Sequence, residues 1–477
     1  MSKPKLVPTT VRPTLAELLP IYQELFPRRI IKQFVKEAQV QLYWRLLTPL
    51  VIVWGLVFQR LQPDHTCDAA VSYFHSGAVD HLDRSRRHTL PLSKRLTSES
   101  TSAYVQGRNR LPLAVLQSAL RYVCQTLTRW VQDEKTLQWH GHAVRVLDGT
   151  TFRLAPQGDL ASTYGQAQNQ LGTSYWVLVK SLVAFCLKSQ AVVGYTEAAG
   201  ATSETALIRP VIEQDPLPHS IYLADRGLGV YRLVQITHPL GHYVVARLNF
   251  RVAKRLLQTT GRRRLSSGTE CRVAWSPERK NKVEADWPCP PIEGRLIYVR
   301  LQRPGFRPMD LYLFTTLLDE TGYRLNEIVV LYGLRWQGEL DYRHIKTTLE
   351  MDEFNVQSAA MFRKELAAGL LTYNLICAYM VKAAEKAGIA PTALSFSRCA
   401  RRLRDILLHG VPVWVEPDHL EEYILERLAK CTLPKQPTKV KHEPRRVRRR
   451  PAIFPALKGD RDTARRQSSR MSKTKVS

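Results

Sequence analysis

Paired cysteines, an export signal and a long apolar run are all missing from this sequence. Its 8 cysteines lie far apart, with no CxxC pair and no zinc-finger spacing, which excludes a disulfide framework and predicts reduced thiols. The N-terminus lacks a basic segment followed by an apolar core and a cleavage site, so secretion is not expected. The longest apolar stretch, residues 46–58, covers about 13 residues, whereas a membrane span needs roughly 20. We therefore predict a cytoplasmic protein without a membrane partner, in which residues 46–58 form a buried helix.

Acidic residues are scarce relative to basic ones. The 477 residues include 70 Lys and Arg against 42 Asp and Glu, a formal net charge of +28, and a field of this sign attracts polyanions. Part of the charge is concentrated in residues 435–477, where 15 basic residues stand against 3 acidic ones. That segment is poor in aromatic residues, which predicts a basic tail that is disordered without DNA. Nucleic acid is therefore the first partner to consider.

The remaining chain divides by its hydrophobic patterning. Residues 1–135 show apolar residues at 3-to-4 spacing and little strand signal, which predicts an all-helical domain. Over 140–248 the pattern predicts three strands, a helix, a fourth strand, a helix and a fifth strand. This order resembles the ribonuclease H-like fold, whose core is a mixed five-stranded sheet with flanking helices. The expected fold class is thus α/β.

The second half of the chain interrupts and then completes this core. Residues 249–309 are rich in Arg, Lys, Pro and Trp and predict a β-rich insertion, with strands at 294–302 and 311–316. Residues 310–385 return to helical patterning and form the second part of the core. Smaller helices are expected over 386–434.

Two aspartates follow buried strands of this core. Asp148 closes the run Ala143–Asp148 and Asp225 closes Ile221–Asp225, so both are poorly placed for core packing. Carboxylates from distant parts of a chain are the expected ligands for a pair of Mg²⁺ ions, which activate an oxygen nucleophile and neutralise the charge at a phosphodiester. Asp followed by Gly is also common in ordinary turns, so a turn without a catalytic role is the alternative for Asp148.

A third acid belongs to a charged helix face. In a helix expected to begin near Asn326, four residues at 3, 4 and 7 spacing project within about 60° of one another, and Arg343 extends the same face. These four are Tyr332, Arg335, Glu339 and Lys346. The alternative is a solvated helix face on which Glu339 pairs with arginines four residues away.

The same residues carry a resemblance to a known family. The spacing Tyr332-x2-Arg335-x3-Glu339-x6-Lys346 is similar to the tyrosine, arginine, glutamate, lysine signature of the insertion-sequence-four family of bacterial transposases. The segments Val146–Thr150 and Leu223–Gly227 around the two aspartates also resemble that family. The resemblance extends over residues 40–385.

This resemblance implies specific roles. Asp148, Asp225 and Glu339 would be the catalytic residues and hold Mg²⁺, or Mn²⁺ in its place, as two ions per site. Tyr332, Arg335 and Lys346 would bind the phosphates and a flipped nucleotide near the cut, with Arg343 and Arg226 as further DNA-binding residues. A tryptophan of the insertion, Trp287 or Trp275, would stack on that base; the alternative for each is a core or loop role.

The resemblance also implies partners. These are double-stranded DNA with terminal inverted repeats, target DNA, and a second copy of the chain in a homodimer that pairs two DNA ends in the bacterial nucleoid. The N-terminal helices would bind the ends, with Arg108 and Arg110 as candidate contacts or, equally, as a solvated basic face. The open alternatives are a ribonuclease H-like nuclease without strand transfer and an inert DNA-binding descendant of a transposase.

Overall fold

The computed structural model describes most of the chain between residues 25 and 434. The described residues are 10, 11, 25, 27–42, 46–83, 90–132, 139–169, 172–277, 287–302, 308–434, 460, 463 and 466. The basic tail expected over 435–477 therefore lies almost wholly outside the described residues.

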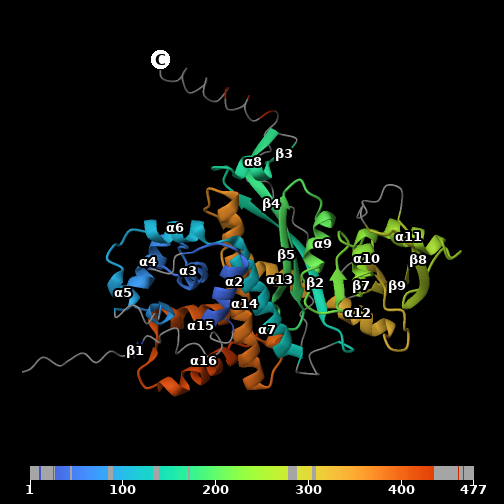
Figure 1. The fold of residues 1–477 in the computed structure, drawn as a ribbon. Coiled ribbons are helices and arrows are strands. Elements are labelled where there is room, and N and C mark those ends of the chain that lie inside the picture. Colours follow the sequence, from blue (N-terminus) through green and yellow to red (C-terminus); the bar gives the residue numbers. More distant parts are fainter. Residues whose placement is uncertain are drawn as a thin grey trace, which may run out of the picture.

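Five strands form the middle of the molecule (Figure 1). They are β2 (Val144–Leu154), β4 (Gly172–Cys186), β5 (Val192–Ala199), β6 (Ile221–Ala224) and β7 (Tyr243–Arg247). They lie in the order β5-β4-β2-β6-β7, with β4 antiparallel to both β2 and β5 and with β2, β6 and β7 mutually parallel. The strand expected to close at Asp148 continues to Leu154, so Asp148 lies inside β2 and not at its end. The α/β class and the mixed sheet are confirmed.

The sheet is wider than the expected five strands. In the described part of the chain it has ten, because β10 (Met309–Thr315) pairs with β7 and is followed by β9 (Ile292–Leu301) and β8 (Thr269–Trp275). The insertion thus continues the sheet edge. It also contains a helix that the sequence reading missed, α11 (Phe250–Gln258), which Asn249 caps and whose apolar face buries Leu256 and Leu257.

Helices cover both faces of the sheet. On one face lie α9 (Ile208–Ile212) and α10 (Tyr231–Thr237); α12 (Leu325–Gly333) and α13 (Trp336–Arg343) lie on the other. Two short strands complete this sheet: β3 (Gln166–Asn169) pairs with β4, and β11 (Glu353–Phe354) pairs with β2. A separate two-stranded sheet pairs β1 (Thr10–Val11) with β12 (Val411–Pro412).

The N-terminal region is mostly helical, as predicted. Its helices are α2 (Arg28–Glu37), α3 (Pro49–Leu61), α4 (Cys67–His75), α5 (Leu92–Arg95), α6 (Ser102–Arg110) and α7 (Leu113–Gln132). Thr48 caps α3, and every residue of α3 is buried. The buried helix expected over 46–58 is confirmed from Pro49 onward, while residues 46–48 precede it.

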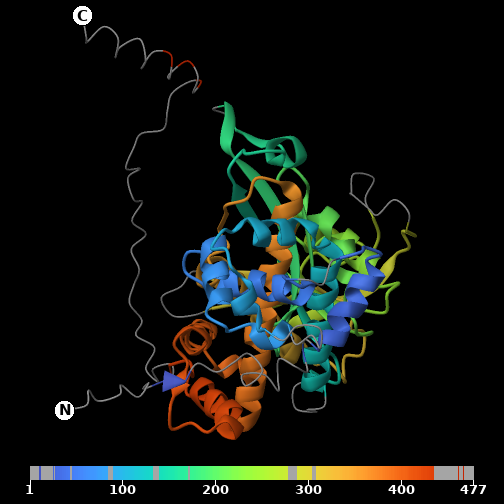
Figure 2. The same cartoon turned by 60° about the vertical axis from the view of Figure 1, so that its left-hand side comes forward.

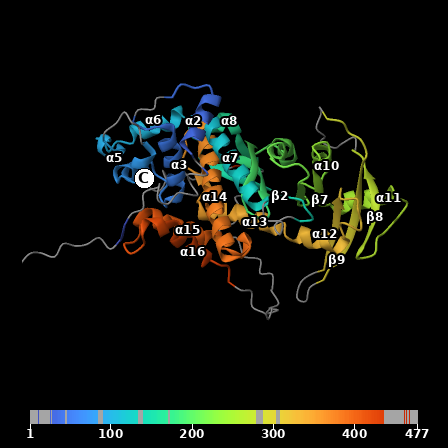
Figure 3. The same cartoon turned by 60° about the horizontal axis from the view of Figure 1, so that its bottom comes forward.

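A 29-residue helix, α14 (Ala359–Ala387), joins the N-terminal helices to the rest (Figure 3). Ser358 caps its start and Gly388 ends it in the left-handed conformation, which favours glycine. By length and composition α14 could cross a membrane, but 89% of its apolar window is buried inside the protein. It packs against α3, α7 and α16 (Leu420–Ala429), with α15 (Phe396–His409) beside it. This helix is thus the central core helix of the molecule.

Buried charges connect α14 to the N-terminal helices. The Glu365 carboxylate binds the guanidinium groups of Arg60 from α3 and Arg108 from α6, and all three side chains are almost completely buried. The expectation that Arg108 contacts DNA is therefore wrong. Its spacing gave no sign of burial, because its partner lies 257 residues further along the chain.

We predict that Glu365→Ala lowers the free energy of unfolding by about 3–5 kcal/mol, because it leaves two buried guanidinium groups without their counter-charge. Urea unfolding followed by circular dichroism measures this difference. The matched control is Glu385→Ala in the same helix, where an exposed pair with Lys382 is lost and a change of less than about 0.5 kcal/mol is expected. Equal losses in the two variants would contradict the role given to the buried cluster.

Candidate active site

Strand alternation places both aspartates on one face of the sheet. Val144 and Val146 of β2 pair with Ile221 and Leu223 of β6, and all four side chains lie in the core under α12. Asp148 and Asp225 each follow two residues later, so they share that face and continue the same register. The next strand repeats the pattern, because Leu223 pairs with Val245 and the face then continues to Arg247. Asp148, Asp225 and Arg247 therefore form a row across three strands.

The signature segment is not one helix. It consists of α12, then a tight turn at Leu334 and Arg335, then α13 and a π-helical turn at His344–Thr348. In the turn, the amides of Arg335 and Gly338 bond to carbonyls three residues back. The helix begins at Leu325, one residue before the expected start near Asn326; Arg324 precedes it, and the Arg324 backbone amide donates to Glu327 at 3.2 Å. Gly333 and Gly338, both weak helix formers, flank the break.

α13 lies directly on β2. A side chain at Gly338 would meet the Val146 methyl at 2.6 Å, so only glycine allows this approach. The Tyr342 hydroxyl donates to the Asp148 carbonyl at 3.1 Å, and the Lys346 ammonium donates to the Thr151 carbonyl at 2.9 Å. The segment is thus attached to the strand that carries Asp148.

Charge and burial act strongly on Asp148. Burial raises its pKa to about 6, the nearby carboxylates of Asp225 and Glu339 add to this rise, and Arg335 opposes it. Arg335 donates to Glu339 at 2.7 Å. Burial also raises the pKa of Tyr332, while the charges of Arg335 and Arg247 lower it. The side chains of Arg335, Glu339, Tyr332 and Arg247 therefore interact electrostatically around Asp148 and Asp225.

The carboxyl groups are near one another but do not enclose a common point. Among the described residues, no group of three or more His, Cys, Asp or Glu side chains is placed to hold a metal ion. Glu339 is turned to Arg335, and Asp225 accepts hydrogen bonds from the amides of Gly227 and Leu228 at 2.9 and 3.0 Å. The donor set consists of hard oxygen ligands, which suits Mg²⁺ chemically.

Lys346 lies further along β2 than the acids. Its ammonium also lies 3.4 Å from Asp352, and Asp352 in turn accepts from Arg153 at 2.7 Å. Arg343 and Arg226 are exposed. The described geometry thus leaves both arginines accessible from outside.

The two tryptophans of the insertion differ. Trp275 is buried against Phe314 and Tyr231, which makes it a core residue. Trp287 is half-buried, and the Arg209 guanidinium lies over its ring at 4.8 Å. His140 and His142 contact Glu327 and Tyr323, respectively.

Sequence reasoning missed three residues of this region: Gly338, Tyr342 and Arg247. Arg247 could have been found, because alternation along its strand places it in the same row as the aspartates. Gly338 and Tyr342 could not, since their roles depend on how α13 packs on β2.

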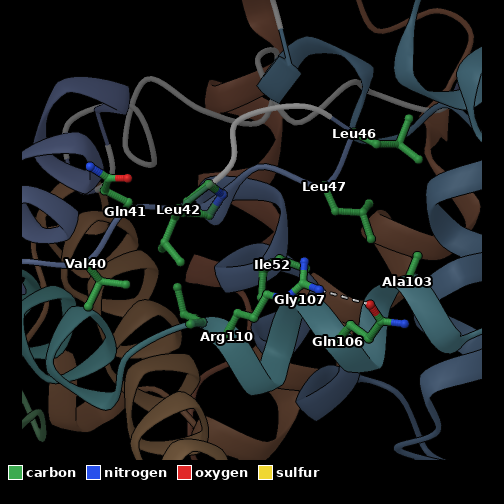
Figure 4. A pocket seen from close by; sticks show the side chains of 12 residues that line it. Val40, Gln41, Leu42, Leu46, Leu47, Ile52, Ala103, Gln106, Gly107 and Arg110 are labelled. Atoms are coloured by element: carbon green, nitrogen blue, oxygen red, sulfur yellow. Dashed lines mark hydrogen bonds between the residues drawn. The ribbon is translucent and has the colours of Figure 1, made fainter.

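A separate cavity of about 560 Å³ lies among the N-terminal helices (Figure 4). Its walls are mainly apolar residues of α3, α6 and the stretches 40–42 and 46–47, and on α6 the Arg110 guanidinium donates to Gln106 at 3.2 Å. None of its lining residues belongs to the acidic site.

The chain is similar to known proteins in sequence and in structure. Residues 139–375 match the family model of the transposase DDE domain. The chain is 24% identical over 444 residues to the transposase InsG for insertion sequence element IS4 of Escherichia coli strain K12, covering 90% of this chain and 92% of that protein. A solved piggyBac transposase synaptic complex with hairpin DNA matches with a TM-score of 0.39 and 12% identity, over 91% of this chain and 88% of that one.

We predict that Asp148→Asn makes the metal-free protein more stable at pH 8, by roughly 1–2 kcal/mol after allowance for solvent screening. The pKa of Asp148 is raised in the folded state, so the unfolded chain ionises first as pH rises from about 4 to about 6, and stability is lost across that window. The gain in the variant should therefore vanish near pH 4. Thermal unfolding at several pH values measures it.

Asp352→Asn is the matched control and should change stability in the opposite direction. Burial tends to raise the pKa of Asp352, but the Arg153 hydrogen bond and the Lys346 charge outweigh it and lower that pKa. Its contribution is present at pH 8 and is lost as pH falls, so the variant should be less stable at pH 8. An Asp148→Asn protein less stable than the parent at pH 8 would refute the electrostatic account of the site.

Proposed function

From the premise that this chain belongs to the DDE transposases of the IS4 type, we propose that Asp148, Asp225 and Glu339 are its catalytic residues. The chain is an enzyme of DNA transposition that cleaves DNA and transfers strands for an insertion sequence. The observation that supports these three positions is the shared register of Asp148 and Asp225 on the face that α13 covers.

The three carboxylates would hold divalent metal ions. Two Mg²⁺ ions, or Mn²⁺ in their place, would supply an activated oxygen nucleophile and neutralise charge at the scissile phosphate. Asp148 and Asp225 offer oxygens from adjacent strands, and Gly227 and Leu228 fix the Asp225 carboxylate. Ionised Asp148 is the ligand form, so its raised pKa makes ion binding weaker below about pH 6.

Glu339 and a DNA phosphate would compete for the Arg335 guanidinium. Without DNA, the guanidinium neutralises Glu339 at 2.7 Å and so competes with a metal ion for that carboxylate. A phosphate offers the same guanidinium a bidentate partner. We propose that DNA binding withdraws Arg335 from Glu339, which then completes the ligand set.

The neighbouring side chains would position the DNA. Tyr332 lies beside Arg335, and Lys346 lies along β2 beyond the acids, so both are proposed to bind phosphates or the flipped nucleotide. Arg343 and Arg226 would contact the backbone. Trp287 would stack on an extruded base only if the base displaced Arg209 from its ring.

The wider architecture supports further proposals. The order β5-β4-β2-β6-β7, with antiparallel and then parallel neighbours, is what a ribonuclease H-like core would have. We propose that residues 140–248 and 310–385 form this core, that 249–309 extend it, and that the N-terminal region (1–135) binds inverted-repeat ends. Exposed Arg110 remains a candidate contact there. A homodimer would pair the two ends with target DNA.

We predict that Glu339→Gln abolishes cleavage of duplex DNA carrying the element's own ends, while binding to that DNA survives. Loss of one metal ligand should cost several kcal/mol of transition-state stabilisation, which is on the order of 1000-fold or more in rate. Gel analysis of cleavage with Mg²⁺ and a mobility-shift assay measure the two properties. Glu327→Gln, in α12 of the same segment, is the control expected to cleave normally. Cleavage that persists in Glu339→Gln would exclude its catalytic role.

We also predict that Arg335→Ala binds Mn²⁺ about 3- to 10-fold more tightly than the parent in the absence of DNA, because a competitor for Glu339 is removed. The same variant should cleave DNA more slowly. Titration calorimetry or Mn²⁺ paramagnetic resonance measures the affinity, with Arg343→Ala as the control for loss of one positive charge. If the two variants bind Mn²⁺ equally, Arg335 does not gate the ligand set.

A further inference from the structure

A two-stranded arm extends beyond the sheet (Figure 2). Its strands are β3 and the first residues of β4, which continue past the point where β2 ends at Leu154, opposite Val177. The base of the arm is fixed: the neighbouring helix α8 (Leu160–Tyr164) packs Tyr164 on Phe362, and Asp159 accepts from the first amide of α14 at 2.8 Å. The arm is thus a supported projection.

One face of the arm presents neutral polar and aromatic groups to solvent. Thr173 and Tyr175 are exposed and alternate along β4, and Gln168 lies opposite Thr173 with their side chains bonded at 3.0 Å. Tyr175 is 53% exposed. None of the residues in β3 or in residues 172–176 is acidic. The nearest carboxylate that the structure describes comes from outside the arm, since an Asp460 oxygen lies beside Gly172. A face whose own side chains carry amide and hydroxyl groups suits a polyanion that also offers hydrogen-bonding edges.

A line of contacts runs from the catalytic segment to this arm. Lys346 lies 3.4 Å from Asp352, Asp352 accepts from Arg153, and the Arg153 guanidinium lies 6.0 Å from the Trp176 ring centre. Trp176 in turn meets Tyr175 edge to face at 5.2 Å. Cations and aromatic rings thus follow β2 outward from Asp148.

The length of this line matches DNA. Six residues of β2 separate Asp148 from Leu154, and four residues of β4 separate Val177 from Thr173. At roughly 3.3 Å per residue this is about 33 Å. One turn of B-form DNA is about 34 Å, and its major groove admits a two-stranded ribbon.

We propose that the β3–β4 arm enters the major groove of the bound duplex about one helical turn from the scissile phosphate, and that Gln168, Thr173 and Tyr175 contact base edges there. Amide and hydroxyl side chains are suited to such edges. This inference rests on the proposed function, because it takes Asp148 as the position of the cut. It makes the arm a determinant of which DNA sequence is used.

The test uses the full-length protein and duplexes cut from DNA at the ends of the element. A long duplex has about 20 base pairs on each side of the cut, and a short one about 6, which ends before the arm. Two variants are compared with the parent: Tyr175→Ala alone, and the double variant Gln168→Ala with Thr173→Ala. We expect each of them to bind the long duplex about 5- to 20-fold more weakly in Ca²⁺. Binding of the short duplex should match the parent. Trp414→Ala, another exposed ring that meets a neighbour edge to face, is the control and should bind both duplexes normally.

Hydroxyl-radical footprinting then locates the contact. Protection of the DNA backbone about ten base pairs from the cut should weaken in the arm variants. Whether the protected base pairs lie on the element side or the flanking side of the cut shows which DNA the arm contacts. Unchanged affinity and footprint in variants that still cleave would overturn this inference alone. Absence of cleavage by the parent protein would instead overturn the proposed function. A variant that loses dimerisation with an unchanged footprint would show that the arm meets a second copy, which also overturns it.

Discussion

The parallel pairing of β2 with β6 is the constraint on which the rest of the site depends. It spans three residue pairs and then stops, so the face that buries Val146 and Leu223 under α12 and α13 ends in two aspartates. The same periodicity brings Arg247 into the row from β7. A one-residue slip of β6 would turn Asp225 to the opposite face, under α9 and α10. The tightly packed valines, leucines and isoleucines of this layer therefore fix the position of the charges.

The price of this arrangement is electrostatic. Burial and neighbouring carboxylates disfavour the ionised form of Asp148, and Arg335 offsets the repulsion by pairing with Glu339. The site thus resembles other functional sites, where strongly shifted groups gather in one place. The break between α12 and α13 helps to gather these groups, because it allows Gly338 to contact β2 while Tyr332 packs in the core.

Local patterns were sufficient for most strands. The strands expected over residues 140–248 appear in the predicted order as β2, β4, β5, β6 and β7. What the sequence did not reveal depends on distant partners. The sheet continues from β7 to β10 because of pairing between residues 66 to 70 positions apart, and Arg108 is buried because Glu365 lies beside it. The single helix expected over the signature was wrong because packing of Gly338 on Val146 outweighs helical periodicity. The three acids and their signature neighbours were named from the sequence, but the pairing of Arg335 with Glu339 in place of a closed carboxylate cluster was not.

The buried cluster of Arg60, Arg108 and Glu365 has a consequence for how the protein is made. Arg108 leaves the ribosome 257 residues before its partner. At roughly 5–20 residues per second, translation takes about 13–50 s to supply Glu365. During that interval the nascent N-terminal helices have neither their counter-charge nor the apolar surface of α14. They must stay solvated or be held by a chaperone until the later helix emerges.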